Sequence, residues 1–240
     1  MNRDERGIIC AMIFGDGYLQ VRRRKTNGKY EYVQSELRIY HSIKQIQYVR
    51  YKAELVRKIL GGVFQVCIHE NTGPGKRYTL CGFAKSHKSL RYMKRWFYPE
   101  GKKTFTRFTL NMLTPHGLAI WWMDDGHLYR NHRKDGTLSS VHGVLNTYCA
   151  KEEAELICEV LESRFNLNGN PGFEKAKGSY IVRFNNASCR RLQELIEPFI
   201  ITEMQYKIDP IRILADTSAG HPKEGDEIVG PYGNKTVRTA

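Results

Sequence analysis

The sequence lacks any apolar run long enough to span a bilayer, and it lacks a segment with the composition of a signal peptide. We therefore expect a protein of the cytoplasm or an organelle matrix that has no membrane partner. No two cysteines have the Cys-x-x-Cys spacing of zinc and redox sites. Most of the cysteines fall within apolar segments, so we expect buried free thiols in a reducing compartment. The six cysteines are Cys10, Cys67, Cys81, Cys149, Cys158 and Cys189.

Acidic residues are scarce in the first half of the chain. Residues 1–111 hold 23 Lys and Arg against 8 Asp and Glu, a net charge of +15. Residues 112–240 hold 15 against 17, a net charge of −2, so the whole chain carries +13. Positive charge clustered in this way is typical of proteins that bind polyanions, although a plain solvated surface is the alternative. We expect a nucleic acid as the partner.

One apolar segment, residues 113–126, ends in two acids. Thr114 can cap a helix, Pro115 suits the first helical position, and an apolar run then leads to Asp124 and Asp125. Carboxylates at a helix C-terminus face the negative end of the helix dipole, which is unfavourable by roughly 0.3–1 kcal/mol each. A bound cation would account for the pair.

A second segment of this kind lies near the N-terminus. Residues 7–17, GIICAMIFGDG, again form an apolar run that ends in an acid and a glycine, here Asp16 and Gly17. Asn2 and Glu5 have the spacing of a capping box. One Asp-Gly after a helix is usually only a turn, but two copies, each followed by a strand-like segment, indicate a repeat.

The two segments resemble the motif of the LAGLIDADG homing endonucleases. Residues 118–126, LAIWWMDDG, match the nine-residue motif at its start and its end, and residues 9–17, ICAMIFGDG, are a looser copy. Two copies in one chain resemble the single-chain, pseudo-symmetric branch of the family. The Thr-Pro pair before the second motif and its Met-Asp-Asp-Gly end resemble the intron-encoded members. The resemblance covers roughly residues 5–210.

The expected secondary structure repeats in the same order in both halves. Period-two and helical patterns, with turns at Asn27-Gly28 and Asp135-Gly136, predict α-β-β-α-β-β-α twice. We expect one half over 1–111, the other over 112–214 and a loosely ordered tail over 215–240. In the first half the expected strands are 18–24, 30–40, 63–69 and 77–83, with helices over 43–60 and 85–97. In the second they are 128–133, 138–147, 172–176 and 180–185, with helices over 151–165 and 187–199.

The resemblance implies an α+β fold in which two antiparallel sheets form a DNA-binding saddle around the paired motif helices. Close packing of these helices requires small residues, and Gly7, Ala11 and Gly15 line one face of the first helix. Since both motifs lie in one chain, we expect a monomer that binds double-stranded DNA.

The resemblance also assigns the chemistry. Asp16 and Asp125, one acid for each half, are expected to bind divalent metal at the floor of the saddle. Gly15 and its counterpart Asp124 complete the metal site, and we expect Asp124 to contribute its backbone carbonyl. Metals held by carboxylates activate water and stabilise charge at phosphorus. We expect Mg²⁺, with Mn²⁺ as a substitute and Ca²⁺ binding without cleavage.

Two groups of residues complete the predicted site. Lys103 and Lys207 resemble the paired active-site lysines of the single-chain members and would stabilise developing negative charge. A face of polar side chains at even spacing on the first two strands suits base edges and phosphates, although an ordinary solvent-facing sheet is the alternative. The expected DNA-binding residues are Gln20, Arg22, Arg24, Arg38, Tyr40 and, in the second half, Asn146.

These expectations favour a site-specific double-strand DNA endonuclease that cuts a long site and leaves short 3′ overhangs. The alternatives are an RNA maturase, which would bind RNA, or a non-cleaving DNA-binding protein of the same fold. The presence of both Asp16 and Asp125 favours cleavage. A glycosidase-like enzyme with paired acids is disfavoured by the +13 charge.

Overall fold

The computed structural model describes residues 1–26, 29–71, 78–134, 138–208, 228–229 and 235–236. The first half comprises α1 (Arg3–Phe14), β1 (Tyr18–Thr26), β2 (Lys29–Ser42), α2 (Ile46–Leu60), β3 (Cys67–Asn71), β4 (Tyr78–Ser86) and α3 (Leu90–Phe97). The short α4 (Arg107–Leu110) leads to the second half. That half comprises α5 (Pro115–Asp125), β5 (Gly126–His132), β6 (Leu138–Cys149), α6 (Lys151–Phe165), β7 (Gly169–Glu174), β8 (Ser179–Phe184) and α7 (Asn186–Ile196).

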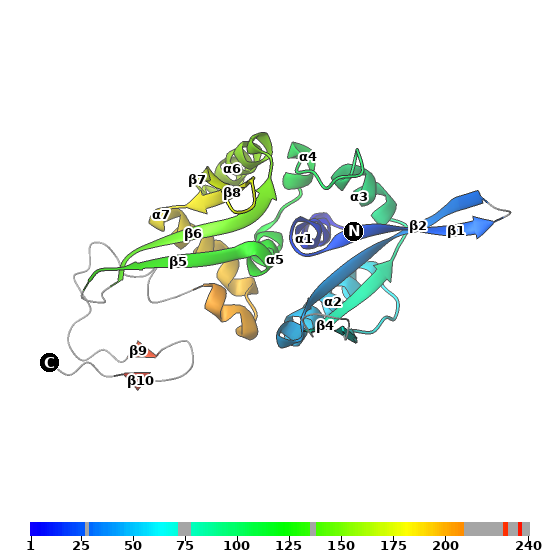
Figure 1. Ribbon diagram of the computed structural model, residues 1–240, viewed down its shortest axis with the longest axis horizontal. Coiled ribbons are helices and arrows are strands. Elements are labelled where there is room, and N and C mark those ends of the chain that lie inside the picture. Colours follow the sequence, from blue (N-terminus) through cyan, green and yellow to red (C-terminus); the bar gives the residue numbers. More distant parts are fainter. Residues whose placement is uncertain (27–28, 72–77, 135–137, 209–227, 230–234, 237–240) are drawn as a thin grey trace.

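Two four-stranded antiparallel sheets dominate the described part of the chain. Their strand orders are β1-β2-β4-β3 and β5-β6-β8-β7, so the second sheet repeats the first. The sheets lie on opposite sides of the central pair formed by α1 and α5 (Figure 1). The predicted α+β fold with a tandem α-β-β-α-β-β-α order is confirmed. No helix in the described ranges is long and apolar enough to cross a bilayer.

Several element boundaries differ from the prediction. The helix expected from residue 43 begins as a 3-10 turn, Ile43–Gln45, before α2 starts at Ile46. The strand expected from residue 63 starts only at Cys67, and Val63 is 94% exposed. The expected turns at 27–28 and 135–136 fall outside the described residues. So does most of the tail, in which only the pair β9 (Ile228–Val229) and β10 (Lys235–Thr236) is described.

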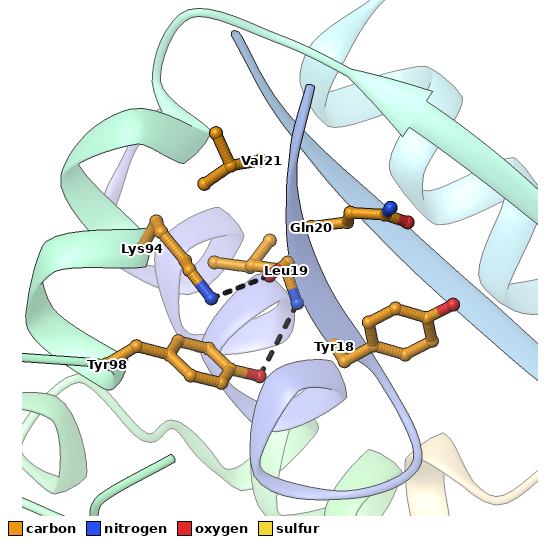
Figure 2. Close-up of a pocket in the computed structure, with 6 residues that line it drawn as sticks. All are labelled: Tyr18, Leu19, Gln20, Val21, Lys94 and Tyr98. Carbon is orange, nitrogen blue, oxygen red and sulfur yellow. Dashed lines mark hydrogen bonds between the residues drawn. The ribbon is translucent and has the colours of Figure 1, made fainter. Parts of the chain in front are cut away.

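Lys94 of α3 and Tyr98, the residue that follows α3, contact the edge strand β1 of the first sheet. Leu19 of the edge strand β1 donates its backbone N–H to the Tyr98 hydroxyl at 3.4 Å, and its carbonyl accepts a hydrogen bond from Lys94 Nζ at 2.9 Å. Figure 2 shows Lys94 and Tyr98 on one side of the strand, with Tyr18 and Gln20 projecting to the other. These contacts satisfy backbone groups that an edge strand otherwise leaves open to pairing.

The two motif helices form the buried centre of the molecule. Both N-terminal caps are as predicted: Asn2 and Glu5 form a capping box, and Thr114 caps α5 with proline at its start. The packing is close, because a Cβ added at Gly117 would lie 2.8 Å from the Gly7 carbonyl oxygen. The small residues on one face of α1 are therefore matched by a glycine on α5.

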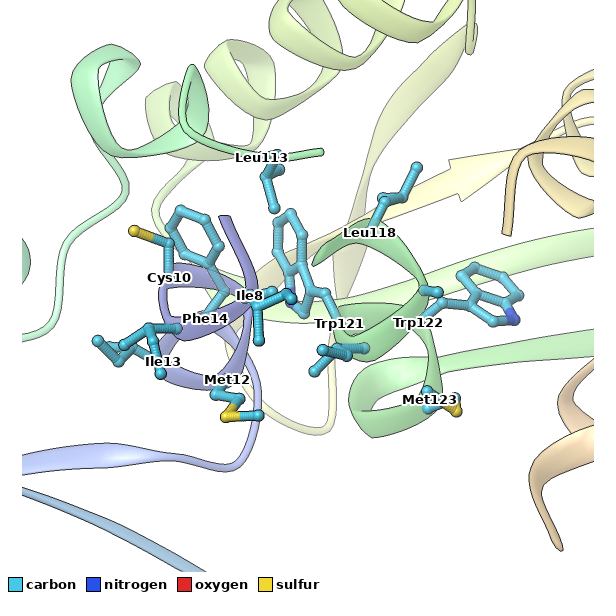
Figure 3. Close-up of a cluster of buried hydrophobic side chains, with 14 of the residues drawn as sticks. Ile8, Cys10, Met12, Ile13, Phe14, Leu113, Leu118, Trp121, Trp122 and Met123 are labelled. Carbon is cyan, nitrogen blue, oxygen red and sulfur yellow. The ribbon is translucent and has the colours of Figure 1, made fainter. Parts of the chain in front are cut away.

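Aromatic side chains fill the space around this close contact. Trp121 stacks on Phe14 with ring centroids 4.9 Å apart and on Phe105 at 5.6 Å, and all three are buried. Figure 3 shows Trp121 pointing toward α1, whereas Trp122 points away into the second half. Trp122 is also buried and donates its indole N–H to the Lys207 carbonyl at 3.0 Å. The contact between the two helices is therefore asymmetric.

Candidate active site

Three carboxylates meet where the motif helices end. Asp16 follows α1 with its side chain 43% exposed, and its backbone N–H donates to Asp124 Oδ2 at 3.2 Å. Asp125 ends α5 and accepts a hydrogen bond from the Trp121 indole at 3.2 Å. Burial, followed by the negative charges of Asp124 and Asp16, raises the pKa of Asp125 to about 7. The two acids expected to act as equivalents therefore differ in their surroundings.

Lys103 and Lys207 reach the same place from opposite halves. Lys103 Nζ donates to the carbonyls of Ile13, Phe14 and Gly15, each at 3.0 Å. Lys207 Nζ donates to the carbonyls of Gly126 at 2.7 Å and Asp124 at 3.3 Å. Each lysine thus places its charge at the negative end of one motif helix.

Burial lowers the pKa of both lysines, and the three acids counteract that effect. The structure therefore brings Lys103 and Lys207 to the acids, in pseudo-symmetric positions that the sequence indicated.

A third lysine, which sequence reasoning missed, also enters the cluster. Lys52 of α2 has no exposed side-chain surface, and its Nζ lies 2.5 Å from Asp124 Oδ1. The Tyr48 hydroxyl donates to the same oxygen at 2.7 Å. The signal was available, because Lys52 follows the buried Val49 by three residues and precedes the buried Val56 by four. A lysine on the buried face of a helix requires a buried partner.

Asp16, His41 and Asp124 have ligand atoms within 4.8 Å of one another, which is close enough for a metal site. The hydrogen bonds oppose that interpretation. Lys52 Nζ lies 3.1 Å from His41 Nε2 and can only donate, so the proton of a neutral ring lies on Nδ1. That atom faces Gln45 at 3.1 Å and Asp16 at 3.5 Å. Burial and the Lys52 charge lower the pKa of His41, so the ring is neutral and offers no free lone pair.

The remaining oxygen donors suit a hard divalent cation. Asp16 and Asp125 supply carboxylates, and Gly15 and Asp124 supply carbonyls at the ends of the two helices. Mg²⁺ and Ca²⁺ prefer such all-oxygen donor sets. Burial is the main cause of the raised pKa of Asp125, and the charges of Asp124 and Asp16 raise it further while Lys103 lowers it. A divalent cation beside this carboxylate would favour its ionised form.

The predicted polar face of the first sheet exists. Gln20 pairs with Glu36 across β1 and β2, and Arg22 and Arg38 both lie against the Glu36 carboxylate, at 3.5 and 2.6 Å. Glu36 is only 5% exposed, so it holds the two arginines on the open side of the sheet. Tyr40 continues the face, beside His69 of β3 with ring centroids 5.7 Å apart.

Arg24 lies in β1, but its side chain is outside the described residues.

The corresponding face of the second sheet carries different side chains. Asn146 lies near His127, with Nδ2 and Nδ1 3.2 Å apart. The strand register places His127, Tyr129, His142 and Arg183 on the same face as Asn146. Sequence reasoning missed these four, although alternation around Leu128 in β5 was a usable signal. This face is aromatic and histidine-rich where the first is arginine-rich.

The chain is similar to known proteins in both sequence and fold. The sequence model of the LAGLIDADG DNA endonuclease family matches residues 6–192. The chain belongs to the LAGLIDADG DNA endonuclease family. The structure is similar to that of the homing endonuclease I-WcaI bound to its DNA recognition sequence, with a TM-score of 0.67, 24% identity and 86% of each chain covered. At this level of identity, the likeness shows the shared fold.

Curated relatives cover parts of the chain. It is 29% identical over 210 residues to Protein RecA of Mycolicibacterium flavescens, covering 85% of this chain and 46% of that protein. It is 34% identical over 124 residues to the probable intron-encoded endonuclease 1 of Wickerhamomyces canadensis, covering 51% and 52%. The chain thus spans about half the length of these relatives.

Proposed function

We propose that the protein is a site-specific double-strand DNA endonuclease that cuts a long recognition site by metal-dependent hydrolysis and leaves short 3′ overhangs. The observation that carries the proposal is the meeting of Asp16 and Asp125, one from each half, with Lys103 and Lys207 at the paired helix ends. One acid and one lysine for each half match a reaction that must be performed once on each DNA strand.

Each group in the cluster has a defined part in this proposal. Asp16 and Asp125, with the carbonyls of Gly15 and Asp124, would hold Mg²⁺, with Mn²⁺ as a substitute and Ca²⁺ binding without cleavage. Such an ion, when bound, supplies an activated water and neutralises charge at the scissile phosphate.

Lys103 and Lys207 would place their ammonium groups at the helix ends beside the acids, where negative charge develops on the phosphate oxygens.

The two sheet faces would read the DNA, with residues 1–111 on one half-site and residues 112–214 on the other. Arginines held by a carboxylate suit guanine edges in the major groove, and the +15 charge of the first half suits phosphates. Both motifs lie in one chain, so a monomer suffices. The proposed contact residues are Gln20, Arg22, Arg24, Arg38, Tyr40 and Asn146.

The six cysteines are all unpaired, which supports a reducing compartment as the place of action.

The test is cleavage of a randomised plasmid library in Mg²⁺, followed by plasmid assays on the selected site. Wild-type protein should produce linear DNA. Asp16→Asn and Asp125→Asn should each lose double-strand cleavage, and the double variant should bind the site without cutting. The exposed Glu152→Gln, on the outer helix α6, is the matched control and should cut normally. Tight RNA binding without DNA cleavage by the wild type would instead support a maturase.

A further inference from the structure

Asp124 is held on both carboxylate oxygens. Oδ1 accepts hydrogen bonds from Lys52 Nζ at 2.5 Å and from the Tyr48 hydroxyl at 2.7 Å. Oδ2 accepts the backbone N–H of Asp16 at 3.2 Å. All three donors belong to the first half of the chain, whereas Asp124 ends the second motif helix. The carboxylate therefore joins the two halves beside the proposed site.

Two series of contacts connect the Lys52 side chain to Asp16. The first runs through Asp124 to the Asp16 backbone. The second runs through His41, whose Nε2 lies 3.1 Å from Lys52 and whose Nδ1 lies 3.5 Å from Asp16 Oδ2. Both Lys52 and Asp124 have side chains with no exposed surface, so their charges compensate each other without water. The Lys52 ammonium also lies 4.4 Å from the centre of the Tyr48 ring.

The arrangement has no mirror image in the other half. The counterpart of Asp124 in the first motif is Gly15, which has no carboxylate to offer. Asp125 contacts Trp121 of its own helix instead. Among the described residues, the contacts that lead from Lys52 through Asp124 and His41 therefore reach Asp16 and not the Asp125 carboxylate.

We propose that Lys52 is a positioning residue that, through Asp124 and His41, fixes the Asp16 half of the site and so governs the cutting of one DNA strand. The proposal rests on the proposed endonuclease function for its effect on cleavage. The Asp124 carboxylate acts here as the partner of an internal cation, the Lys52 ammonium.

The first experiment needs neither DNA nor metal. Urea unfolding is measured for Lys52→Met, Asp124→Asn and the double variant, with the exposed Lys58→Met of the same helix as control. Each single change leaves a buried group without its partner, so each should lower the unfolding midpoint. The double variant should lose less than the sum of the two, while Lys58→Met should be neutral. Additive losses would overturn the pairing.

The second experiment measures each strand separately on an end-labelled duplex that carries the selected site. Lys52→Met should slow one strand at least tenfold more than the other, and the slowed strand should be the one that Asp16→Asn slows more. Tyr48→Phe removes the hydroxyl that donates to Asp124 Oδ1, so it should slow the same strand more than the other. This variant replaces Lys52→Met in the test if Lys52→Met does not fold. Equal slowing of both strands, or slowing of the other strand, would overturn the proposal.

The two experiments separate the two claims. A wild-type protein that cuts no DNA would contradict the endonuclease function, whereas the urea measurements would still decide whether Lys52 and Asp124 are coupled.

Discussion

Gly15 and Asp124 occupy the same position in the two motifs, and the structure places one against the other. A Cβ added at Gly15 would lie 2.2 Å from Asp124 Oδ2 and 2.6 Å from Asp124 Cβ. The second motif can carry an acid at this position only because the first motif carries no side chain there. The pseudo-symmetry of the chain is thus broken at its centre by a complementary pair.

Gly15→Ala should therefore destabilise the protein. Overpacking of a close contact costs about 1–3 kcal/mol, and the displaced Asp124 would move the Asp16 backbone with it. Urea unfolding should show the loss, and cleavage should slow. In an Asp124→Gly background the same glycine change should cost much less, because both the carboxylate and the Cβ that the new methyl group would meet are gone. Equal cost in both backgrounds would show that the contact is not the cause.

Lys103→Met and Lys207→Met should each reduce cleavage more than binding. Removing one preorganised charge from a site of this kind slows reactions by about 10²–10³-fold. The matched control is Lys102→Met, because Lys102 is the exposed neighbour of Lys103 in the sequence. Single-turnover rates and equilibrium affinities for the selected duplex should be measured together. A control that loses as much activity as Lys103→Met would argue for general loss of basic charge.

Arg38→Ala should weaken DNA binding, and the salt dependence of the affinity should show whether Arg38 contacts a phosphate or a base. If Arg38 contacts a phosphate, the slope of log affinity against log salt should fall by about one. If it contacts a base, the slope should hold and the preference at one base pair should relax. Arg57→Ala, on α2 and paired with Glu54, is the control. Affinity that does not change with salt in the wild type would contradict the electrostatic argument as a whole.

Much of the fold could be predicted because its signals are local. Asn2, Thr114 and Pro115 determine where the motif helices begin through backbone bonds within a few residues. The start of β3 could not be predicted in this way, because the apolar Val63 is exposed and the strand depends on pairing with β4. On α2, Leu55 and Ile59 lie at the margin of the buried face while Lys52 is fully buried, which the periodic pattern of apolar residues does not predict.

The residues of the candidate site also fall into those that the sequence could predict and those that it could not. The sequence indicated the acids and both helix-capping lysines, through motif position and through resemblance. It could not indicate that Lys52 contacts Asp124, 72 residues away, because no local pattern encodes that pairing. Lysine is almost always exposed unless it is paired, so a lysine among the apolar residues of a helix was the one indication of a buried acidic partner.

Asp125 gives the last prediction, which concerns pH in the absence of metal and DNA. Burial raises its pKa from the ordinary 3.8 to about 7 in the folded protein, so the folded state holds this proton more tightly. The resulting stabilisation is complete below about pH 4 and is lost as the pH rises through 7. Such a difference in pKa is equivalent to about 4 kcal/mol. Asp125→Asn does not ionise and should lack this contribution.

The measurement is the free energy of unfolding of wild type and Asp125→Asn between pH 4 and 8. Asp125→Asn should gain stability relative to the wild type as the pH rises, and Glu152→Gln should not. Histidines with lowered pKa act in the opposite sense, but they are common to all three proteins and cancel in the difference. They are His41, His87, His116 and His127. Millimolar Mg²⁺ should then stabilise the wild type more at pH 8 than at pH 5, because the cation binds the ionised carboxylate. A wild-type-to-variant difference that does not change with pH would mean that Asp125 is not the buried, proton-binding acid of the site.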